Sequence, residues 1–230
     1  MLPFSGALSN EAAIRKSLDS KLGDSRIEGV QPAQIPGLFE VRVSGRDGPQ
    51  IFYTDAQGNF LLDGNLYDAK SGRNLTEERL RRLTAINFSS LPLELAVKVQ
   101  RGNGKRVVAI FSDPYCPACK QFEKVLQQVD DITVYYYMYP VIRPELEEHS
   151  RAVWCAPDRA KAWLELALHG RPITAAAKCD APIDKVKELG KSLRVNSTPT
   201  LILANGESVR GGMPAERLRS VLDEAMKAKK

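Results

Sequence analysis

Residues 105–129 read KRVVAIFSDPYCPACKQFEKVLQQV, and this stretch decides the fold. Its first part, Val107 to Phe111, is apolar and rich in β-branched residues, which predicts a strand. From Lys120 onward the apolar residues recur at helical spacing, which predicts a helix. Between the two lies Cys116-Pro117-Ala118-Cys119, so the sequence places two thiols three positions apart at the start of a helix.

This spacing suits dithiol–disulfide exchange. A helix N-terminus stabilises negative charge and therefore favours a thiolate on Cys116. Cys119 falls one turn into the helix, where we expect it to be more buried. Pro117 fits the first helical turn, because its missing N–H has no intrahelical partner there. An exposed thiolate that attacks a substrate disulfide, and a shielded thiol that resolves the mixed disulfide, are the predicted roles. Asp113 could assist proton transfer, but a turn residue before Pro114 explains it as well.

Two other interpretations of the cysteines are open: a zinc site, or inert core thiols. Zinc would need two further ligands, but Cys155 and Cys179 do not form a second CxxC motif. The two histidines, His149 and His169, have no ligand spacing to each other. The strand–helix context favours redox chemistry over both alternatives. We therefore predict no metal and no bound cofactor.

A second element lies far along the chain. Asn196-Ser197-Thr198-Pro199-Thr200 stands directly before an apolar run, Leu201 to Leu203, that predicts a strand. An X–Pro bond can be cis at a cost of only about 0.5–1 kcal/mol. A cis bond here would leave the Thr198 backbone free to pair with an extended substrate segment. An ordinary trans proline that opens a strand is the alternative.

Composition sets limits on the class of protein. The chain has 230 residues, 43% of them hydrophobic and 27% charged, and a net charge of +5, as in ordinary globular proteins. It lacks the aromatic-interleaved basic patch of a nucleic-acid binder and any apolar run of membrane-span length. Four cysteines that divide into two pairs favour an oxidising compartment. The first residues do not resemble a secretory signal, so we expect any export signal to be absent from this chain.

The first 75 residues predict a small α+β domain. Ser9-Asn10 can cap a helix that ends at Gly23. Four short strand-like runs follow, separated by turn signals; they are Ile27–Val30, Leu38–Val43, Ile51–Thr54 and Phe60–Leu62. Such a module has little core of its own and often completes it by pairing with another chain. We therefore expect residues 1–75 to form a dimerisation domain.

The rest of the chain predicts a linker and a second domain. Thr76 can cap a helix from Glu77 to about Ile86, and we assign residues 76–90 to a linker helix in solvent; a helix packed on either domain is the alternative. Residues 91–230 alternate strands and helices, as in an α/β layered domain. A helical region at about 145–195 interrupts this pattern.

Four segments together resemble the periplasmic disulfide isomerases of the DsbC/DsbG family, most closely the DsbC branch. They are Phe111 to Cys119, Val153-Trp154-Cys155-Ala156, Thr198-Pro199-Thr200 and Gly64-Asn65-Leu66-Tyr67-Asp68. The resemblance implies a thioredoxin-fold catalytic domain with a helical insertion and a small N-terminal, cystatin-like dimerisation domain. The dipeptide Pro117-Ala118 departs from the family, because the DsbC branch resembles Gly-Tyr there and the DsbG branch Pro-Tyr.

The resemblance also implies roles for single residues. Cys116 corresponds to the nucleophile and Cys119 to the resolving thiol. Pro199 corresponds to a cis-proline, preceded by Thr198, at the substrate-binding site. Cys155 and Cys179 correspond to a structural disulfide of the DsbC branch.

The expected function is isomerisation and reduction of incorrect disulfides in exported proteins, with chaperone activity. The expected partners are a second copy of this chain, misfolded disulfide-containing proteins and a membrane reductant of the DsbD type, with no nucleic acid. The expected location is the periplasm. A DsbA-like dithiol oxidase and a chaperone-like binding module with secondary redox activity are the alternatives.

Overall fold

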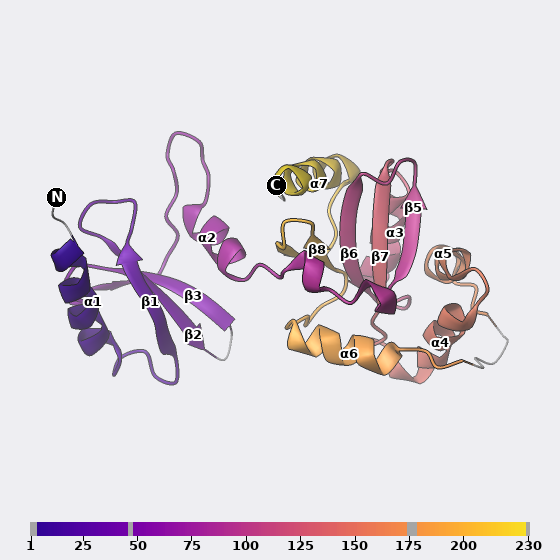
Figure 1. The fold of residues 1–230 in the computed structure, drawn as a ribbon, viewed down its shortest axis with the longest axis horizontal. Helices are drawn as coiled ribbons and strands as arrows, with labels where there is room; N and C mark the ends of the chain where they lie inside the picture. The colour runs from indigo at the N-terminus through magenta and orange to yellow at the C-terminus, as the bar shows by residue number, and fades with distance from the viewer. Residues whose placement is uncertain (1–3, 46–47, 174–178, 229–230) are drawn as a thin grey trace. The chain divides into compact units, whose positions relative to one another are not determined.

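The computed structural model describes residues 4–45, 48–173 and 179–228. They fall into two compact units, Met1–Thr84 and Ala85–Lys230, and each unit has its own β-sheet (Figure 1). None of the described helices combines the length and the apolar character that a membrane span requires.

The first unit packs one helix on a four-stranded antiparallel sheet of order β1-β2-β3-β4. Its elements are α1 (Phe4–Leu18), β1 (Arg26–Pro32), β2 (Phe39–Gly45), β3 (Gly48–Thr54), β4 (Leu61–Leu62) and α2 (Leu75–Leu83). Ile14 and Leu18, one turn apart on α1, pack in a core with Val41 and Val43 of β2. This core is small, as the sequence predicts.

The first helix begins earlier than the sequence predicts. It starts at Phe4, so Ser9 and Asn10 lie in its interior and are not the cap. Serine and asparagine favour caps through local hydrogen bonds, but extending an existing helix gains one backbone bond per residue. The regular helix also ends at Leu18, before the left-handed Gly23.

Helix α2 packs on the first sheet rather than standing in solvent. Its N-cap is Asn74, whose side chain accepts a hydrogen bond from the Glu77 N–H, so the predicted cap at Thr76 is wrong. Thr76 is buried instead, and its hydroxyl lies 2.6 Å from the Tyr53 hydroxyl of β3. The Leu66 N–H donates to the same Thr76 oxygen. The packed alternative therefore describes this helix.

The second unit is a five-stranded sheet of order β5-β7-β6-β8-β9. Its strands are β5 (Val97–Arg101), β6 (Arg106–Ser112), β7 (Ile132–Met138), β8 (Thr200–Leu203) and β9 (Ser208–Arg210). Its α-helices are α3 (Pro117–Leu126), α4 (Glu147–Cys155), α5 (Arg159–His169), α6 (Ile183–Ser192) and α7 (Ala215–Ala228), and short 3-10 turns are η1 (Phe88–Ser90), η2 (Leu93–Leu95) and η3 (Pro144–Leu146). Strands β6 and β7 are parallel and are joined through α3, whereas the other pairs are antiparallel.

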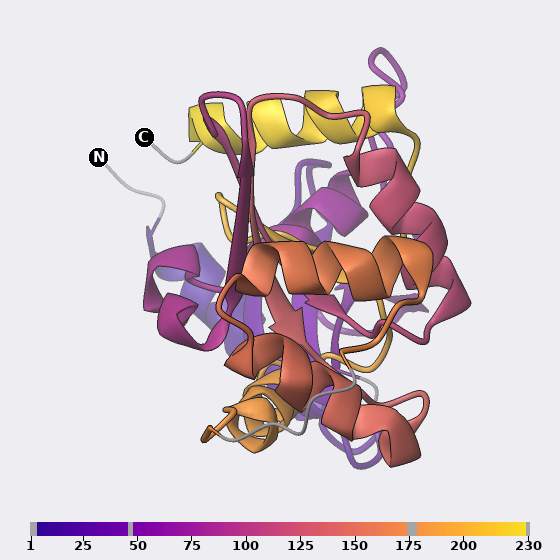
Figure 2. The same ribbon diagram turned by 90° about the vertical axis from the view of Figure 1, so that its right-hand side faces the viewer.

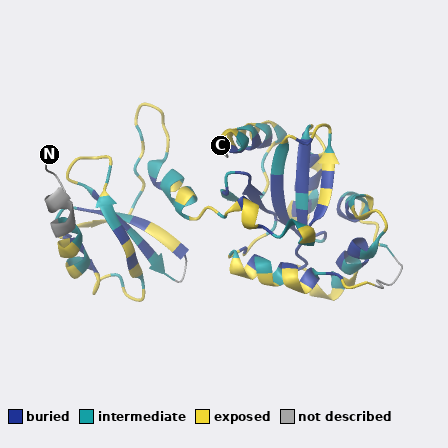
Figure 3. Ribbon diagram, viewed as in Figure 1, coloured by how far each residue is buried: buried dark blue, intermediate teal, exposed yellow. Residues whose placement is uncertain are grey.

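Strand β6 is buried on both faces, which explains its continuous apolar sequence. Val108 and Ile110 belong to a core with residues of α3, α5 and α7, whereas Ala109 and Phe111 belong to a second core with residues of α6 and η1. The burial colours in Figure 3 show the resulting dark centre of the sheet. Because both faces are covered, the strand is fixed, and so is the start of α3.

Helices α4, α5 and α6 form an insertion between β7 and β8. Figure 2 turns α4 and α5, which are on the right in Figure 1, toward the viewer. The break that the sequence predicts at Pro157 falls between α4 and α5. Trp163 of α5 is fully buried, with its ring centroid 5.0 Å from that of Tyr136 on β7, so the insertion shares the core of the sheet.

Replacing Thr76 with valine should destabilise the first unit. The change leaves the buried Tyr53 hydroxyl without its partner, at a cost of about 1–3 kcal/mol, and also removes the acceptor of the partly buried Leu66 N–H, which costs less. Hydrogen exchange of the β2 and β3 amides measures the effect, because both tryptophans, Trp154 and Trp163, lie in the second unit. The control is Thr84→Val at an exposed threonine; equal protection in the two variants would contradict the prediction.

Candidate active site

The two cysteines stand at the N-terminus of α3, directly after the loop that ends β6. Cys116 is the N-cap residue and has an extended backbone, Pro117 is the first helical residue, and Cys119 lies one turn inside. Both thiols are free, and the exposed fractions of the two residues are 6% and 4%. Cys119 is buried, as expected, but Cys116 is also largely covered rather than freely exposed.

The Thr198–Pro199 segment lies next to Cys116 because β8 pairs with β6. In the antiparallel register Phe111 faces Thr200, so the residues just before β8 meet the residues just after β6. The Cys116 thiol donates a hydrogen bond to the Thr198 carbonyl over 3.4 Å. The Thr198–Pro199 peptide bond is cis. The structure thus brings together Cys116, Cys119, Thr198 and Pro199 from segments about eighty residues apart.

The surroundings of Cys116 favour its thiolate. Burial acts to raise the pKa of this thiol, but the Thr198 side chain and the backbone N–H groups of Cys119 and Ala118 oppose it, and the net pKa is lowered. The N–H groups of a helix start are the feature that the sequence predicts. Cys116 therefore ionises more readily than an ordinary cysteine.

The surroundings of Cys119 have the opposite effect. Burial raises the pKa of this thiol to about 12, despite polar contacts from the Asp113 backbone and the Ser112 side chain. Cys119 is thus protonated near neutral pH, while Cys116 is the better nucleophile. Two thiols three residues apart are in this way given distinct chemistry by one helix start.

Asp113 is fully buried and fixes the loops around the dithiol. Its Oδ1 accepts the Tyr115 N–H, and its Oδ2 accepts the N–H groups of Val141 and Ile142, each over 2.8 Å. Its backbone carbonyl accepts the Cys116 N–H. The interpretation as a turn residue therefore describes Asp113, with the addition of a second loop that the sequence did not indicate.

Four further residues around the dithiol were not found from the sequence. The Tyr115 hydroxyl contacts His149 Nδ1 on α4, and Lys120 lies over the Tyr115 ring. Glu123 of α3 is buried, and burial raises its pKa to about 7 despite a hydrogen bond from the Tyr136 hydroxyl. The position of Glu123, one turn after Cys119, is the only sequence signal that places this side chain near the site. Nothing in the local sequence links Tyr115 to His149.

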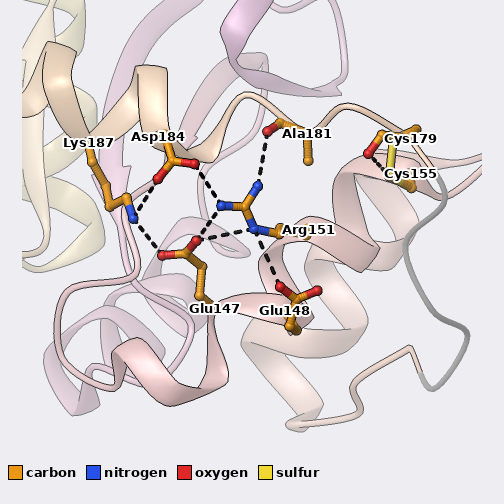
Figure 4. A network of polar contacts seen from close by, with 8 residues as sticks. All are labelled: Glu147, Glu148, Arg151, Cys155, Cys179, Ala181, Asp184 and Lys187. Atoms are coloured by element: carbon orange, nitrogen blue, oxygen red, sulfur yellow. Dashed lines mark hydrogen bonds and ion pairs between the residues drawn. A yellow bond between two sulfur atoms is a disulfide. The ribbon is translucent and has the colours of Figure 1, made fainter.

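Cys155 and Cys179 lie away from the dithiol and are joined by a disulfide (Figure 4). The bond links the last residue of α4 to the segment before α6. Figure 4 also shows ion pairs that link α4 to α6: Arg151 of α4 binds Asp184 of α6, and Lys187 of α6 binds Glu147 of α4. Lys187 also binds Asp184 within α6. The disulfide and the ion pairs hold α4 and α6 together.

This ion-pair network depends on pH. Hydrogen bonds from Lys187 and Arg151 lower the pKa of Asp184 to about 2, from an ordinary value of 3.8. The carboxylate therefore favours the folded state above the ordinary pKa, and this contribution disappears as the pH falls toward 2. Because Asp184 is exposed, the contribution is small.

No group of three or more His, Cys, Asp or Glu side chains in the described ranges could hold a metal ion. His149 contacts Tyr115, and neither Cys155 nor Cys179 is a free thiol. The zinc interpretation therefore finds no support in the described residues.

Two family models match the chain. A thioredoxin-like domain matches residues 93–226, and a disulfide bond isomerase protein N-terminal domain matches residues 5–77. A probable thiol:disulfide interchange protein DsbC from Bordetella avium is 40% identical over 210 residues, which cover 91% of this chain and 74% of the relative. The DsbC protein of Escherichia coli K12 is 29% identical over 97% of this chain and 92% of its own length.

A solved structure is also similar. The crystal structure of a disulfide interchange protein from Neisseria gonorrhoeae matches with a TM-score of 0.57 and 37% identity. The match covers 59% of this chain and 99% of that one. The two sequence relatives and the solved structure are therefore all disulfide interchange proteins.

Replacing Thr198 with valine should raise the pKa of Cys116, because the Thr198 side chain opposes the effect of burial. A raised pKa lowers the thiolate fraction near neutral pH, so alkylation by iodoacetamide should slow there and recover at higher pH. The pH dependence of alkylation, in a Cys119→Ser background, measures the shift. Thr133→Val removes another buried hydroxyl, far from the dithiol on β7, and serves as the control. An unchanged midpoint in Thr198→Val would contradict the assignment.

Removing the Cys155–Cys179 disulfide should lower the free energy of unfolding by about 3 kcal/mol, from the entropy of closing a loop of this length. Urea unfolding followed by tryptophan fluorescence measures this in Cys155→Ala/Cys179→Ala, since both tryptophans lie in the affected unit. The alkylation rate of Cys116 should not change. A variant as stable as the parent would show that the ion pairs alone hold α4 and α6 together.

Proposed function

The chain belongs to the DsbC family of thiol:disulfide interchange proteins and is thus a thiol–disulfide oxidoreductase, and from this premise we propose how its own residues perform the exchange. We propose that Cys116 is the nucleophile, that Cys119 resolves the mixed disulfide, and that Thr198 and Pro199 bind the substrate backbone. The observation that supports these roles best is the opposite shift of the two thiol pKa values.

In the first step the Cys116 thiolate attacks one sulfur of a substrate disulfide. A bond forms between Cys116 and that sulfur, the substrate S–S bond breaks, and the departing sulfur leaves as a thiolate that takes a proton from solvent. The site favours this step because its hydrogen bonds stabilise the attacking thiolate before substrate arrives.

Two routes lead from the mixed disulfide. Another substrate thiolate can attack the substrate sulfur, which forms a new substrate disulfide and returns the Cys116 thiolate; this is isomerisation. Alternatively, Cys119 loses its proton and attacks Cys116, which releases the reduced substrate and leaves a Cys116–Cys119 disulfide. A pKa of about 12 keeps Cys119 protonated for most of the time, which favours the first route.

The Thr198 backbone is the proposed clamp for substrate. Its carbonyl lies within hydrogen-bond distance of the reacting sulfur, and the residue just precedes β8. An extended substrate segment that pairs with Thr198 would place its cysteine beside Cys116. Backbone atoms can pair with an extended segment of any sequence. An isomerase that acts on many substrates requires a binding site of this kind.

We further propose that residues 1–75 form a homodimer and that residues 91–230 are the catalytic domain. Residues 76–90 connect the two, but helix α2 at their start packs on the first sheet, so the connecting segment outside the first unit begins at Ala85. Strand β4 supports the homodimer, because it is a short edge strand and both its leucines, Leu61 and Leu62, are exposed together with Phe60. Exposed apolar residues at a sheet edge indicate a partner chain. Misfolded disulfide-containing proteins are the proposed substrates.

The reductive route consumes two electrons for each substrate disulfide, so the Cys116–Cys119 disulfide must be reduced again. We propose a membrane reductant of the DsbD type for this step. The proposed location is the periplasm; the Cys155–Cys179 disulfide supports an oxidising compartment.

Refolding of a scrambled multi-disulfide protein tests the proposal. Cys116→Ala should abolish the recovery of native substrate, whereas Cys119→Ala should retain part of it, because isomerisation does not require the resolving thiol. A chain that lacks residues 1–75 should reduce small disulfides at the parent rate but lose most isomerase activity. Full activity in Cys116→Ala would favour a binding module. A dithiol that is mostly oxidised in cells would favour a DsbA-like oxidase.

A further inference from the structure

The buried carboxylate of Asp113 joins the nucleophile's turn to a second loop. One of its oxygens accepts the Tyr115 N–H, and the other accepts the N–H groups of Val141 and Ile142. Its backbone carbonyl accepts the Cys116 N–H. A single carboxylate group thus bridges the backbone of the 141–142 loop and the backbone of the turn that carries Cys116.

The two loops are fixed to each other. Hydrogen bonds to a buried carboxylate are strong, and Asp113 makes three of them. The Tyr139 N–H also donates to the Ser112 carbonyl, so the ends of β6 and β7 are tied directly. Val141 and Ile142 therefore keep a constant place relative to Cys116.

The side chains of Val141 and Ile142 are apolar and exposed. The exposed fraction is 42% for Val141 and 50% for Ile142. Among the described residues from Ala85 onward, they are the only large hydrophobic residues that are exposed. Pro117 and Ala118, which separate the two cysteines, are exposed as well.

We propose that Val141 and Ile142 form a specificity subsite that binds apolar side chains next to the cysteine of an extended substrate segment. This inference rests on the proposed function. The occupant follows from chemistry: cysteine is among the most buried residue types, so its neighbours in a sequence are often core residues. A wrongly paired cysteine exposes those apolar neighbours, and an apolar surface held in a fixed place relative to the nucleophile's turn would bind them.

Peptides that carry a cysteine as a mixed disulfide with 2-nitro-5-thiobenzoate provide the test. Attack by Cys116 on the peptide sulfur breaks the S–S bond and releases the coloured aryl thiolate, and the rate of release from excess reduced protein in a single turnover gives the second-order rate constant. Two extended peptides are compared, with leucine and valine or with serine and asparagine beside the cysteine. The full-length protein should prefer the apolar peptide by about tenfold, which corresponds to about 1.4 kcal/mol.

The variant Val141→Ser/Ile142→Ser should lose most of this preference, mainly through weaker binding of the apolar peptide, measured as the concentration that gives the half-maximal single-turnover rate. Val141→Ile/Ile142→Val keeps the surface apolar and should keep the preference. Ile35→Ser, at an isoleucine that is 47% exposed in the other unit, is the matched control and should react as the parent does. Alkylation of Cys116 by iodoacetamide, and reaction with glutathione disulfide, should be equal in all four proteins.

Three outcomes would overturn the inference. They are an unchanged preference in the serine variant, an equal loss in Ile35→Ser, or a loss that follows a change of oligomeric state, which would assign the surface to a second copy of the chain. A parent protein that rearranges scrambled disulfides but shows no peptide preference would refute this inference alone. A parent protein inactive in both assays would instead refute the proposed function.

Discussion

The antiparallel pairing of β6 with β8 is the interaction on which the site depends. Strand β6 ends in the turn that carries Cys116, the proposed nucleophile, and β8 begins just after Pro199, the proposed substrate-binding proline. The register that sets Phe111 opposite Thr200 brings these two ends together. Since β6 is buried on both faces, a shift of one residue would put each of its side chains in the wrong core. The position of Thr198 beside Cys116 is therefore fixed by the core of the domain.

Within that frame, the start of α3 gives the two thiols different properties. Backbone N–H groups that a helix leaves unpaired are near Cys116 and lower its pKa, whereas Cys119 is one turn deeper, where burial dominates. The difference requires no charged side chain as a direct partner. It follows from where the helix begins, and Pro117 at the first helical position helps to fix that point.

The sequence was sufficient for the chemistry and for the order of elements, but not for contacts between distant loops. The dithiol, the proline before β8 and the strands of both sheets follow from local patterns and from a family resemblance. The predicted cap of α2 was wrong because Asn74 and Thr76 are both good capping residues. A tertiary contact with Tyr53 engages the Thr76 hydroxyl, and Asn74 caps the helix. The loop of Val141 and Ile142 could not be found, because its link to Asp113 joins residues 28 and 29 positions apart. No periodicity in a sequence encodes such a link.

The hydrogen bond from the Cys116 thiol to the Thr198 carbonyl has a further consequence. A thiol can donate this bond, but a thiolate has no proton to donate. While Cys116 is protonated, the carbonyl has a partner and the sulfur is a poor nucleophile. Ionisation activates the sulfur and frees one lone pair of the Thr198 carbonyl in the same event, so the proposed clamp gains an acceptor position for an arriving peptide when the thiolate forms. Loss of one proton thus changes both reactivity and binding. While Cys116 is protonated, its sulfur reacts poorly and the Thr198 carbonyl has one acceptor position fewer for substrate.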